Sequence, residues 1–369
     1  MRNFASKSSS QLFDLPLIGT VLTLAFFGLV MIYDASVVAA FRDFGDKLYY
    51  FKNQLIWTSI GLIAMLTLSF IDYHKIIKYA PKFLLICICL LVLVLIPHIG
   101  AKAYGARRWI NVGAFTFQPS ELAKLSLITY MAYIMSKFKN LKIRLADIFY
   151  VLFLPTFLLT GLVLLEPDLG TSLIFIGIIL SMYFIGGGSI LHFIFMIPAV
   201  AGSAVIAIVT HPYRVARLKA FMDPSYDPQG VSYQINQILI SLGNGGLFGV
   251  GIGGSRGKFD FIPEVHSDAI FAVVGEELGF AGAIIFIAVF LFLISRVVKI
   301  AKEAKDYEGK LLASGILALI SIQAFLNLAS VVAIVPLTGI PLPFISYGGS
   351  SLLLTLASIG ILLNIQKQS

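Results

Sequence analysis

Charge and cysteine are both scarce in this chain. Only 12% of its 369 residues are charged and 58% are apolar, and the mean hydropathy is +0.92. These values lie far outside the usage of soluble globular proteins and indicate a polytopic membrane protein. The two cysteines, Cys87 and Cys89, lie in one apolar run. On a helix they point roughly 200° from each other, which suits neither a disulfide nor a metal site.

Several other features are missing from the sequence. No small-residue cleavage site precedes the first apolar run, so we expect an uncleaved first helix rather than a signal peptide. The five histidines are scattered, with no metal-spaced pair and no H-E-x-x-H sequence, which argues against a His-ligated metal. Since we find no internal repeat and no stretch able to bury a separate core, we expect a single membrane domain over residues 1–369.

Ten apolar runs are long enough to cross a bilayer as helices. They lie at about 15–35, 54–71, 80–97, 119–136, 146–165, 169–186, 190–210, 268–295, 311–335 and 344–365. We therefore predict an all-α polytopic membrane protein of about ten transmembrane helices, with both ends on one side. Lysine and arginine number fifteen on that side and eleven on the other, which predicts cytoplasmic termini.

One long loop, residues 211–267, separates the seventh and eighth predicted spans on the side opposite the termini. Its basic residues are Arg214, Arg217, Lys219, Arg256 and Lys258. Positive charge is normally scarce on the outer face, so it suggests an anionic ligand such as a phosphate. Acidic residues on the same side favour a near-neutral surface equally well. Within the loop, residues 233–242 place apolar side chains at helical spacing, which predicts a short amphipathic helix on the membrane surface.

The end of this loop is rich in glycine, with eight glycines among residues 243–257. The run contains a G-x-G-x-x-G pattern, but no strand precedes it and no crossover helix follows, so we reject a nucleotide-binding fold. The residues around Lys258 also miss the P-loop pattern. A flexible linker and a cradle of backbone amides for a ligand fit these residues equally.

Ionisable residues within the predicted spans are stronger signals of function. A charge at a helix centre costs roughly 2.5–3.5 kcal/mol on insertion scales and usually faces a cavity or a partner. Glu121 and Lys124 are three apart on the fourth span, so they share a helical face; a purely structural ion pair is the alternative. Asp268 opens the eighth span after Ser267. There the helix dipole favours the ionised carboxylate that a general base requires, and a capping role is the alternative.

A second irregular segment, residues 336–351, is rich in proline and glycine and cannot form a continuous helix. Non-helical backbone at membrane depth is tolerated only against protein or a watery cavity. We therefore predict that this outer loop folds back over such a cavity.

Five motifs together resemble the SEDS family (shape, elongation, division and sporulation), whose members include RodA and FtsW. They are Gly105–Ile110, Gln118–Lys124, Glu166–Thr171, Pro263–Asp268 and Pro341–Ser350. They occur in the family's order across nearly the whole chain, and residues 31–36 look more like the FtsW branch. Relatives often read His-Thr-Asp-Phe where this chain has His-Ser-Asp-Ala at residues 266–269, a departure that leaves the carboxylate unchanged.

The resemblance implies a peptidoglycan glycosyltransferase that polymerises lipid II, an undecaprenyl-pyrophosphate disaccharide-peptide, in cell division or elongation. It implies a class B penicillin-binding protein, a transpeptidase, as partner. It also implies a multi-pass protein of the bacterial cytoplasmic (inner) membrane, with the active site on the extracytoplasmic face. No nucleic acid and no organic cofactor are expected.

By carry-over from the family, Asp268 is the catalytic residue. The residues expected to bind substrate are Glu121, Lys124, Arg108, Trp109, Gln118, Ser120, Lys258, Asp260, Glu264, His266, Ser346, Gly348 and Gly349. In the mechanism we expect, Asp268 takes the proton from the acceptor sugar's 4-hydroxyl as it attacks the donor's anomeric carbon. Arg108, Lys124, Lys258 or a divalent cation (Mg or Mn) would stabilise the departing pyrophosphate, although no residue is assigned as a metal ligand.

Two other classes of function fit parts of the sequence. A transporter or lipid II flippase would explain the spans, the charges of Glu121 and Lys124 and the basic outer face. Alternating access usually needs a midplane site between repeats, whereas the polar residues here concentrate toward one side of the membrane, which favours the polymerase. A scaffold that only docks the penicillin-binding protein would leave Asp268 and Glu121 without a role.

Overall fold

The computed structural model describes residues 13–103, 106–113, 115–138, 149–258 and 262–369. Within these ranges the chain is mainly helical. The helices are α1 (Leu15–Phe44), α2 (Tyr49–Phe70), α3 (Tyr73–Lys78), α4 (Ala80–Leu95), α5 (Pro119–Phe138), the π-helix η1 (Phe149–Phe153), α7 (Leu154–Leu165), α8 (Leu169–Ile185), α9 (Ile190–Val209), α10 (Pro212–Met222), α11 (Tyr233–Gly245), α12 (Ile270–Glu303), α13 (Tyr307–Val331) and α14 (Gly349–Gln368).

Each of the ten predicted spans coincides with one of these helices. By length and composition, α1, α2, α9, α12, α13 and α14 could cross a membrane, while α4, α7 and α8 are apolar but shorter. The remaining one of the ten, α5, is less apolar because it carries Glu121 and Lys124. The prediction of an all-α polytopic membrane protein is therefore confirmed.

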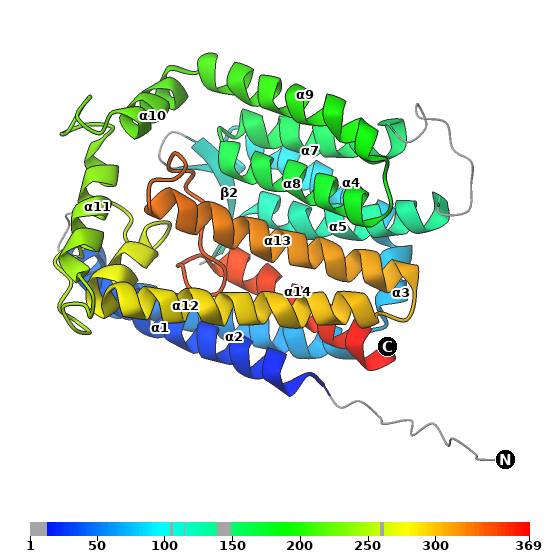
Figure 1. Ribbon diagram of the computed structural model, residues 1–369, viewed down its shortest axis with the longest axis horizontal. Coiled ribbons are helices and arrows are strands. Elements are labelled where there is room, and N and C mark those ends of the chain that lie inside the picture. The colour runs from blue at the N-terminus through cyan, green and yellow to red at the C-terminus, as the bar shows by residue number, and fades with distance from the viewer. Residues whose placement is uncertain (1–12, 104–105, 114, 139–148, 259–261) are drawn as a thin grey trace.

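The first and last spans meet at one end of the bundle. The Asp14 N–H donates to the Gln366 Oε1 at 2.7 Å, and the Asp14 carboxylate also accepts from Arg296 of α12 at 2.5 Å. Figure 1 shows this end on the right, and α10, α11 and the strand β2 at the opposite end. The beginning of α1 and the end of α14 thus lie at the same end of the bundle, as an even number of spans predicts.

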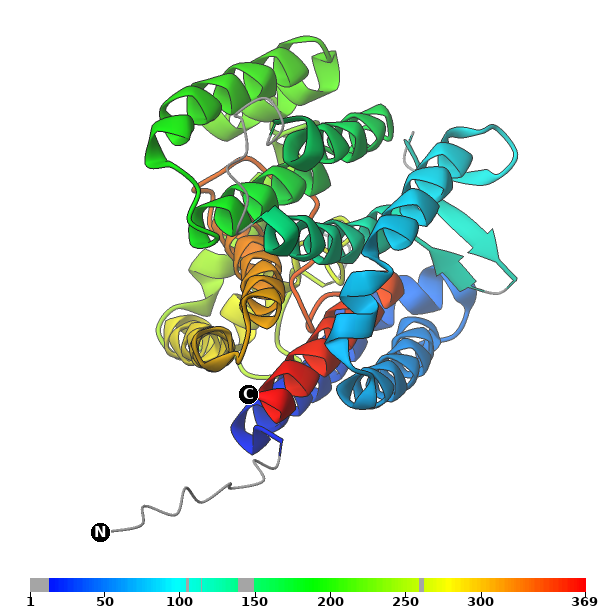
Figure 2. The same cartoon turned by 90° about the vertical axis from the view of Figure 1, so that its right-hand side faces the viewer.

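The centre of the bundle is formed by α13 and α14. Within their most apolar windows, α14 has 83% of its residues buried and α13 has 67%, whereas α9 has none. Figure 2 accordingly shows α9 at the edge of the bundle, beside α7 and α8. An apolar groove of about 550 Å³ opens between these three helices. Polar side chains on α13 and α14 are therefore enclosed by protein.

A small sheet lies between α4 and α5, where the sequence indicated only a connecting loop. Its strands β1 (Gly100–Ala103), β2 (Ala106–Val112) and β3 (Phe115–Phe117) pair antiparallel in the order β1-β2-β3. Trp109 lies opposite Ala101, and Ile110 lies opposite both Gly100 and Phe117. The strands are too short for an alternating pattern to identify them, so their pairing had to come from the structure.

The glycine-rich stretch is neither a linker nor an open cradle, because it closes a break in α12. Gly279 has φ 67° and ψ −170° inside that helix, so the regular hydrogen bonds stop there. Four bonds of 2.9–3.1 Å replace them: the N–H groups of Val250 and Gly251 donate to the carbonyls of Glu276 and Glu277, and those of Phe280 and Ala281 donate to Gly246 and Leu247. The freed backbone groups are thus satisfied within the protein, as a membrane environment requires.

The side chain of Glu276 fastens the same stretch. Its carboxylate accepts hydrogen bonds from the hydroxyls of Ser241 and Ser255, both at 2.5 Å, and from the N–H groups of Arg256 and Gly257. Glu276 is buried, and these bonds offset the desolvation of its charge. The amides that the sequence offered to a ligand therefore serve α12 itself.

The long loop contains two helices. The predicted helix is confirmed as α11, which buries Ile235 and Ile238 and packs on α12. Its place on the membrane surface stays a prediction. A Cβ on Gly245 would lie only 2.2 Å from the Gly275 carbonyl oxygen, so the two helices touch through their backbones. The helix α10 was not predicted, because its apolar face is narrow and its polar face is basic.

The segment between α13 and α14 folds back into the bundle. Ile340, Leu342 and Ile345 are at most 3% exposed, so the loop folds back against protein, as predicted. That it covers a cavity stays a prediction. The predicted start of the last span at residue 344 is wrong, since Phe344 has φ 67° and α14 begins only at Gly349. The sequence signal extended the helix because the buried loop is itself apolar.

We expect Gly279→Ala to destabilise the protein by about 2–4 kcal/mol, because the backbone region of Gly279 is almost restricted to glycine. A Cβ there would also lie 2.2 Å from the Gly249 nitrogen. The midpoint of thermal unfolding in detergent measures the effect. Gly19→Ala is the control, as its added Cβ meets nothing within 4 Å; equal midpoints for the two variants would contradict the role of the break.

Candidate functional site

Asp268 lies in the turn before α12, outside the membrane-spanning helix. The N-cap of α12 is Ala269, which makes no side-chain capping bond. Neither Ser267 nor Asp268 is therefore the N-cap residue of this helix. The Oδ1 atom of Asp268 is enclosed and accepts no hydrogen bond from the residues that the structure describes. Its Oδ2 faces Gly339, where an added Cβ would lie 3.9 Å away. Gly339 belongs to the segment between α13 and α14, residues 332–348, which we call the re-entrant loop. The carboxylate is therefore held next to that loop with one oxygen unused.

Burial raises the pKa of Asp268 to about 6, and the positive charge of Arg217 opposes this rise. Glu264 adds a smaller contribution that raises the pKa. A carboxyl group with this pKa is mostly ionised at neutral pH and is more basic than an ordinary aspartate. These are the properties that a general base needs.

Asn327 of α13 holds the backbone around Asp268. Its Nδ2 donates to the Asp268 carbonyl and to the Ile340 carbonyl, each at 2.8 Å, and its side chain is fully buried. One amide thus joins the turn that carries Asp268 to the re-entrant loop. Asn327 was not among the residues predicted from the sequence, although an amide in the middle of an apolar span is a signal of function.

Glu121 and Lys124 form the predicted ion pair on α5, with 2.8 Å between Oε1 and Nζ. Both residues are at most 4% exposed. Lys124 also donates to the Gln323 Oε1 at 3.0 Å, and the Gln323 Nε2 donates to the Pro341 carbonyl at 3.0 Å. Because Gln323 precedes Asn327 by one helical turn, a single face of α13 connects the ion pair to the loop beside Asp268. A role for Glu121 and Lys124 in binding substrate stays a prediction.

Arg108 and Trp109 lie on β2. The Arg108 guanidinium donates to the carbonyls of Glu166 and Pro167 at 2.9 and 2.5 Å, and it lies 3.9 Å from the Asp168 carboxylate. Arg108 therefore fixes the turn between α7 and α8, and Trp109, as the next residue on the strand, points to the opposite face. Substrate binding by either residue stays a prediction.

Glu166, in the same turn, is a buried carboxyl group that the sequence analysis did not place in the site. Neither carboxyl oxygen finds a hydrogen-bond partner among the described residues. Burial raises its pKa to about 9, with help from the negative charge of Asp168. Glu166 is therefore neutral at physiological pH.

The predicted residues at the beginning of α5 and α14 close the re-entrant loop. They are Gln118, whose N–H donates to the Ser350 hydroxyl at 3.1 Å; Ser120, which is fully buried; Ser346, whose hydroxyl accepts from the Leu342 N–H at 2.8 Å; and Gly348, whose N–H donates to Gln54 at 3.3 Å. Gly349 lies against the Trp57 indole, where a Cβ would come within 2.2 Å. The Ser120 hydroxyl has no hydrogen-bond partner among the described residues, whereas the other four have the contacts given. Contacts with substrate stay predictions for all five.

Lys258 is committed to a buried bridge. Its Nζ lies 2.8 Å from the Asp34 carboxylate of α1 and 3.2 Å from the Glu277 carboxylate of α12, and Lys258 is 5% exposed. Two carboxylates already contact its ammonium group, so Lys258 links α1 to α12 in a structural role. Asp260, also predicted to bind substrate, lies outside the described residues.

His266 anchors the turn that leads to Asp268. Its ring packs on Tyr50 and Tyr347, with centroids 4.2 and 5.5 Å away, and its carbonyl accepts from the Tyr347 N–H at 2.9 Å. Burial lowers the pKa of His266, so the ring is neutral at pH 7. Glu264, 3.8 Å away, is more exposed and lies nearer to solvent.

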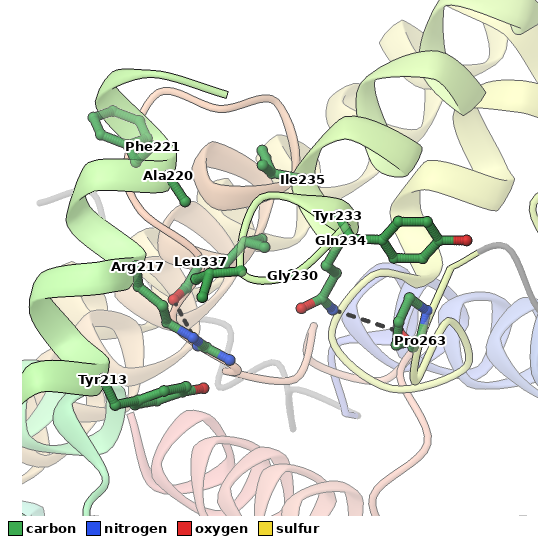
Figure 3. Close-up of a pocket in the computed structure, with 11 residues that line it drawn as sticks. Tyr213, Arg217, Ala220, Phe221, Gly230, Tyr233, Gln234, Ile235, Pro263 and Leu337 are labelled. Carbon is green, nitrogen blue, oxygen red and sulfur yellow. Dashed lines mark hydrogen bonds between the residues drawn. The ribbon is translucent and has the colours of Figure 1, made fainter. Parts of the chain in front are cut away.

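A cavity of about 340 Å³ opens beside this turn. Figure 3 shows Tyr213 and Arg217 of α10, Gln234 of α11, Pro263 of the turn and Leu337 of the re-entrant loop around it. The Arg217 Nη1 donates to the Leu337 carbonyl at 3.0 Å, and the guanidinium lies 4.8 Å from the centre of the Tyr213 ring. The sequence showed Arg217 only as one of several loop charges.

The described residues do not form a metal cage, since no three His, Cys, Asp or Glu side chains among them lie close enough to hold an ion. Magnesium is commonly held by one or two carboxylates together with substrate phosphates. A divalent cation (Mg or Mn) held by carboxylates stays a prediction.

The FtsW, RodA and SpoVE family model, described as "Cell cycle protein", matches residues 15–369. The chain is 43% identical over 355 residues to the probable peptidoglycan glycosyltransferase FtsW of Trichlorobacter lovleyi, which covers 96% of this chain and 93% of the relative. It is 41% identical over 360 residues to the stage V sporulation protein E of Bacillus subtilis, with 96% and 97% covered.

Two solved structures share the fold. A chain from "Structural coordination of polymerization and crosslinking by a peptidoglycan synthase complex" superposes with a TM-score of 0.78 at 27% identity, covering 96% of this chain and 98% of that chain. The rod shape determining protein RodA of Thermus thermophilus superposes with a TM-score of 0.71 at 26% identity, covering 96% and 97%. The resemblance found in the sequence motifs is thereby confirmed. The chain belongs to the FtsW, RodA and SpoVE family of cell cycle proteins.

Proposed function

We propose that this chain is a peptidoglycan glycosyltransferase that joins lipid II molecules into β-1,4 glycan strands, in cell division or elongation. The family membership and the relative named as a peptidoglycan glycosyltransferase at 43% identity support this activity. The observation that carries the mechanism is the enclosed, unpaired oxygen of Asp268, in a turn whose Pro263 lines a cavity with a basic side chain.

The reaction is a single inverting displacement. Asp268 accepts the proton of the acceptor sugar's 4-hydroxyl while the oxygen attacks the anomeric carbon of the donor. The bond from that carbon to the pyrophosphate breaks, and its electron pair leaves with the phosphate oxygen. Because attack comes from the opposite face, an α-linked donor yields a β-linked product. Pyrophosphate is a weak base, so it needs positive charge nearby rather than a general acid.

The bundle orients this chemistry across the bacterial cytoplasmic membrane. Asp268 directly precedes α12, whose far part contacts Asp14 through Arg296, so α12 begins at the end opposite the joined termini (Figure 1). Lysine and arginine are more numerous on the side of the termini. The termini are therefore cytoplasmic and the site is extracytoplasmic. A class B penicillin-binding protein, which crosslinks the strands, is the partner; the similarity to a chain of a peptidoglycan synthase complex supports this pairing.

The alternative is a lipid II flippase, which rests on the charges of α5. Glu121 and Lys124 neutralise each other at 2.8 Å, and Gln323 takes a further hydrogen bond from Lys124. A transport site needs groups that exchange partners with the substrate, whereas these groups are joined to the structural amides of α13. The geometry favours the polymerase.

Replacing Asp268 by asparagine keeps the shape of the side chain and removes its basicity. We expect Asp268→Asn to lower the rate of glycan formation by about 10²–10⁴-fold, with the thermal unfolding midpoint not reduced. Purified protein with labelled lipid II gives the polymer length on a gel, and vesicles with lipid II give its translocation. Asp223→Asn, on an exposed aspartate of the same outer loop, is the control. Full polymerisation by Asp268→Asn would exclude it as the base, and translocation without polymer in the unaltered protein would support the flippase.

The pH profile should report the ionisation of Asp268. Since burial raises its pKa to about 6, kcat/KM should be constant above that pH and fall about tenfold per unit below it, as the protonated form accumulates. Rates measured across this range in nanodiscs test the point. A profile that stays flat down to about pH 4, where an ordinary aspartate titrates, would contradict the enclosed environment.

Asn327 should act as a positioning residue. Asn327→Leu removes both donors at similar size, so we expect kcat to fall by about 10–100-fold with KM little changed. Loosening the turn should hydrate Asp268, so the pH midpoint of the rate should move below 6. Asn364→Leu is the control, because the Asn364 amide also bridges buried groups, at the end with the termini. The same midpoint shift in both variants would indicate a general effect on packing.

A further inference from the structure

The cations expected to stabilise the departing pyrophosphate all have other partners. Lys124 is bound to Glu121 and Gln323, and Lys258 is bound to two carboxylates. Arg108 donates to two backbone carbonyls of the turn between α7 and α8. Breaking the buried contacts of Lys124 or Lys258 for substrate would leave a charge unpaired. Breaking the partly exposed contacts of Arg108 would leave the two carbonyls of that turn without a donor. Another basic residue is therefore needed to stabilise the departing pyrophosphate.

Arg217 is placed differently from these three. One guanidinium nitrogen donates to the Leu337 carbonyl at 3.0 Å, which fixes the side chain in place. The group lines the cavity of about 340 Å³, and Figure 3 shows it projecting from α10 toward the space shared with Gln234 and Pro263. No carboxylate contacts Arg217 within salt-bridge distance among the described ion pairs. Its charge is thus available to an anion in the cavity.

Two connections place this cavity beside the base. Leu337, which accepts from Arg217, is two residues before Gly339, and Gly339 faces the Asp268 Oδ2. Pro263 lines the cavity and belongs to the turn that ends at Asp268. Arg217 is also the cation whose field acts on the Asp268 carboxyl. A group bound by Arg217 therefore lies near the reacting atoms.

We infer that Arg217 and the cavity between α10, α11 and the re-entrant loop form the site for the pyrophosphate that leaves the donor sugar. This inference rests on the proposed function. Two substrates, a donor and an acceptor, each carry a pyrophosphate, and the inference assigns this cavity to the donor's. The acceptor's own pyrophosphate is two sugar rings from the hydroxyl that Asp268 deprotonates. The donor's pyrophosphate is attached directly to the carbon under attack, so a cation beside Asp268 stabilises the leaving group. The planar guanidinium can make paired hydrogen bonds to phosphate oxygens, which a lysine cannot.

The remaining lining suits a sugar diphosphate. Tyr213 and Tyr233 offer aromatic faces and hydroxyl donors, and Gln234 offers an amide that already reaches the Pro263 carbonyl at 3.4 Å. As the bond from the anomeric carbon breaks, negative charge grows on the bridging phosphate oxygen. The proton moves to Asp268 at the other side of the same carbon. Arg217 and Asp268 thus serve opposite ends of one displacement.

Binding of inorganic pyrophosphate to the full-length protein tests the site without needing turnover. Isothermal titration in detergent should show Arg217→Gln binding pyrophosphate about 10–100-fold more weakly than the unaltered chain. Lys219→Gln is the matched control, since it removes one charge from the same helix at an exposed position; it should change binding by less than about twofold. Arg217→Lys should fall between the two, because it keeps the charge and loses the paired geometry. Should Arg217→Gln fail to fold, Arg217→Lys carries the comparison.

Polymerisation of lipid II by the same variants separates this inference from the proposed function. We expect Arg217→Gln to lower kcat by about 10²-fold and Lys219→Gln to leave it unchanged. Unaltered pyrophosphate binding in Arg217→Gln, or equal loss in both variants, would overturn the site even if the protein polymerises. Loss confined to Arg217→Gln in a protein that makes no polymer would keep the anion site and reject the polymerase.

Discussion

The structure depends on the satisfaction of backbone hydrogen bonds inside the membrane domain. The re-entrant loop between α13 and α14 is not helical, so its carbonyls need donors that lipid cannot supply. Gln323 and Asn327 provide them, with hydrogen bonds to Pro341 and Ile340. Because Asn327 also binds the Asp268 carbonyl, the same amide that makes the loop possible sets the position of the carboxylate. The site follows from the constraint that governs the fold.

The break in α12 is a second answer to the same constraint. The backbone groups freed by the break form hydrogen bonds with the glycine-rich stretch. The Glu276 carboxylate accepts hydrogen bonds from the hydroxyls of Ser241 and Ser255. Glycine is needed where this stretch meets the helix, since a Cβ at Gly249 would lie 2.0 Å from the Glu277 carbonyl oxygen. Residues that resemble a binding site in the sequence thus make their hydrogen bonds within the protein. Arg217, by contrast, resembles a surface charge in the sequence and faces a cavity in the structure.

Much of the fold could be predicted because a bilayer allows few solutions. Long apolar runs must become helices, and all ten predicted spans did. The pairing of Glu121 with Lys124 followed from helical spacing, and the family motifs singled out Asp268. The contacts of Lys258 with Asp34, and those of Asn327 with Asp268, join residues far apart in the chain, so no local pattern could reveal them. The start of α14 was misplaced because the periodicity of apolar residues does not distinguish a buried loop from a helix.

The interruption at Gly279 also changes what counts as one structural unit. The glycine-rich stretch bonds to both sides of the break, to Glu276 and Glu277 before it and to Phe280 and Ala281 after it. Residues 270–278 follow directly from the turn with Asp268. The remainder of α12 continues to Glu303 and, through Arg296, contacts Asp14 near the joined termini. The boundary between the part of α12 next to the candidate site and the part that continues toward the termini therefore lies at Gly279, inside the helix, and not at its first residue.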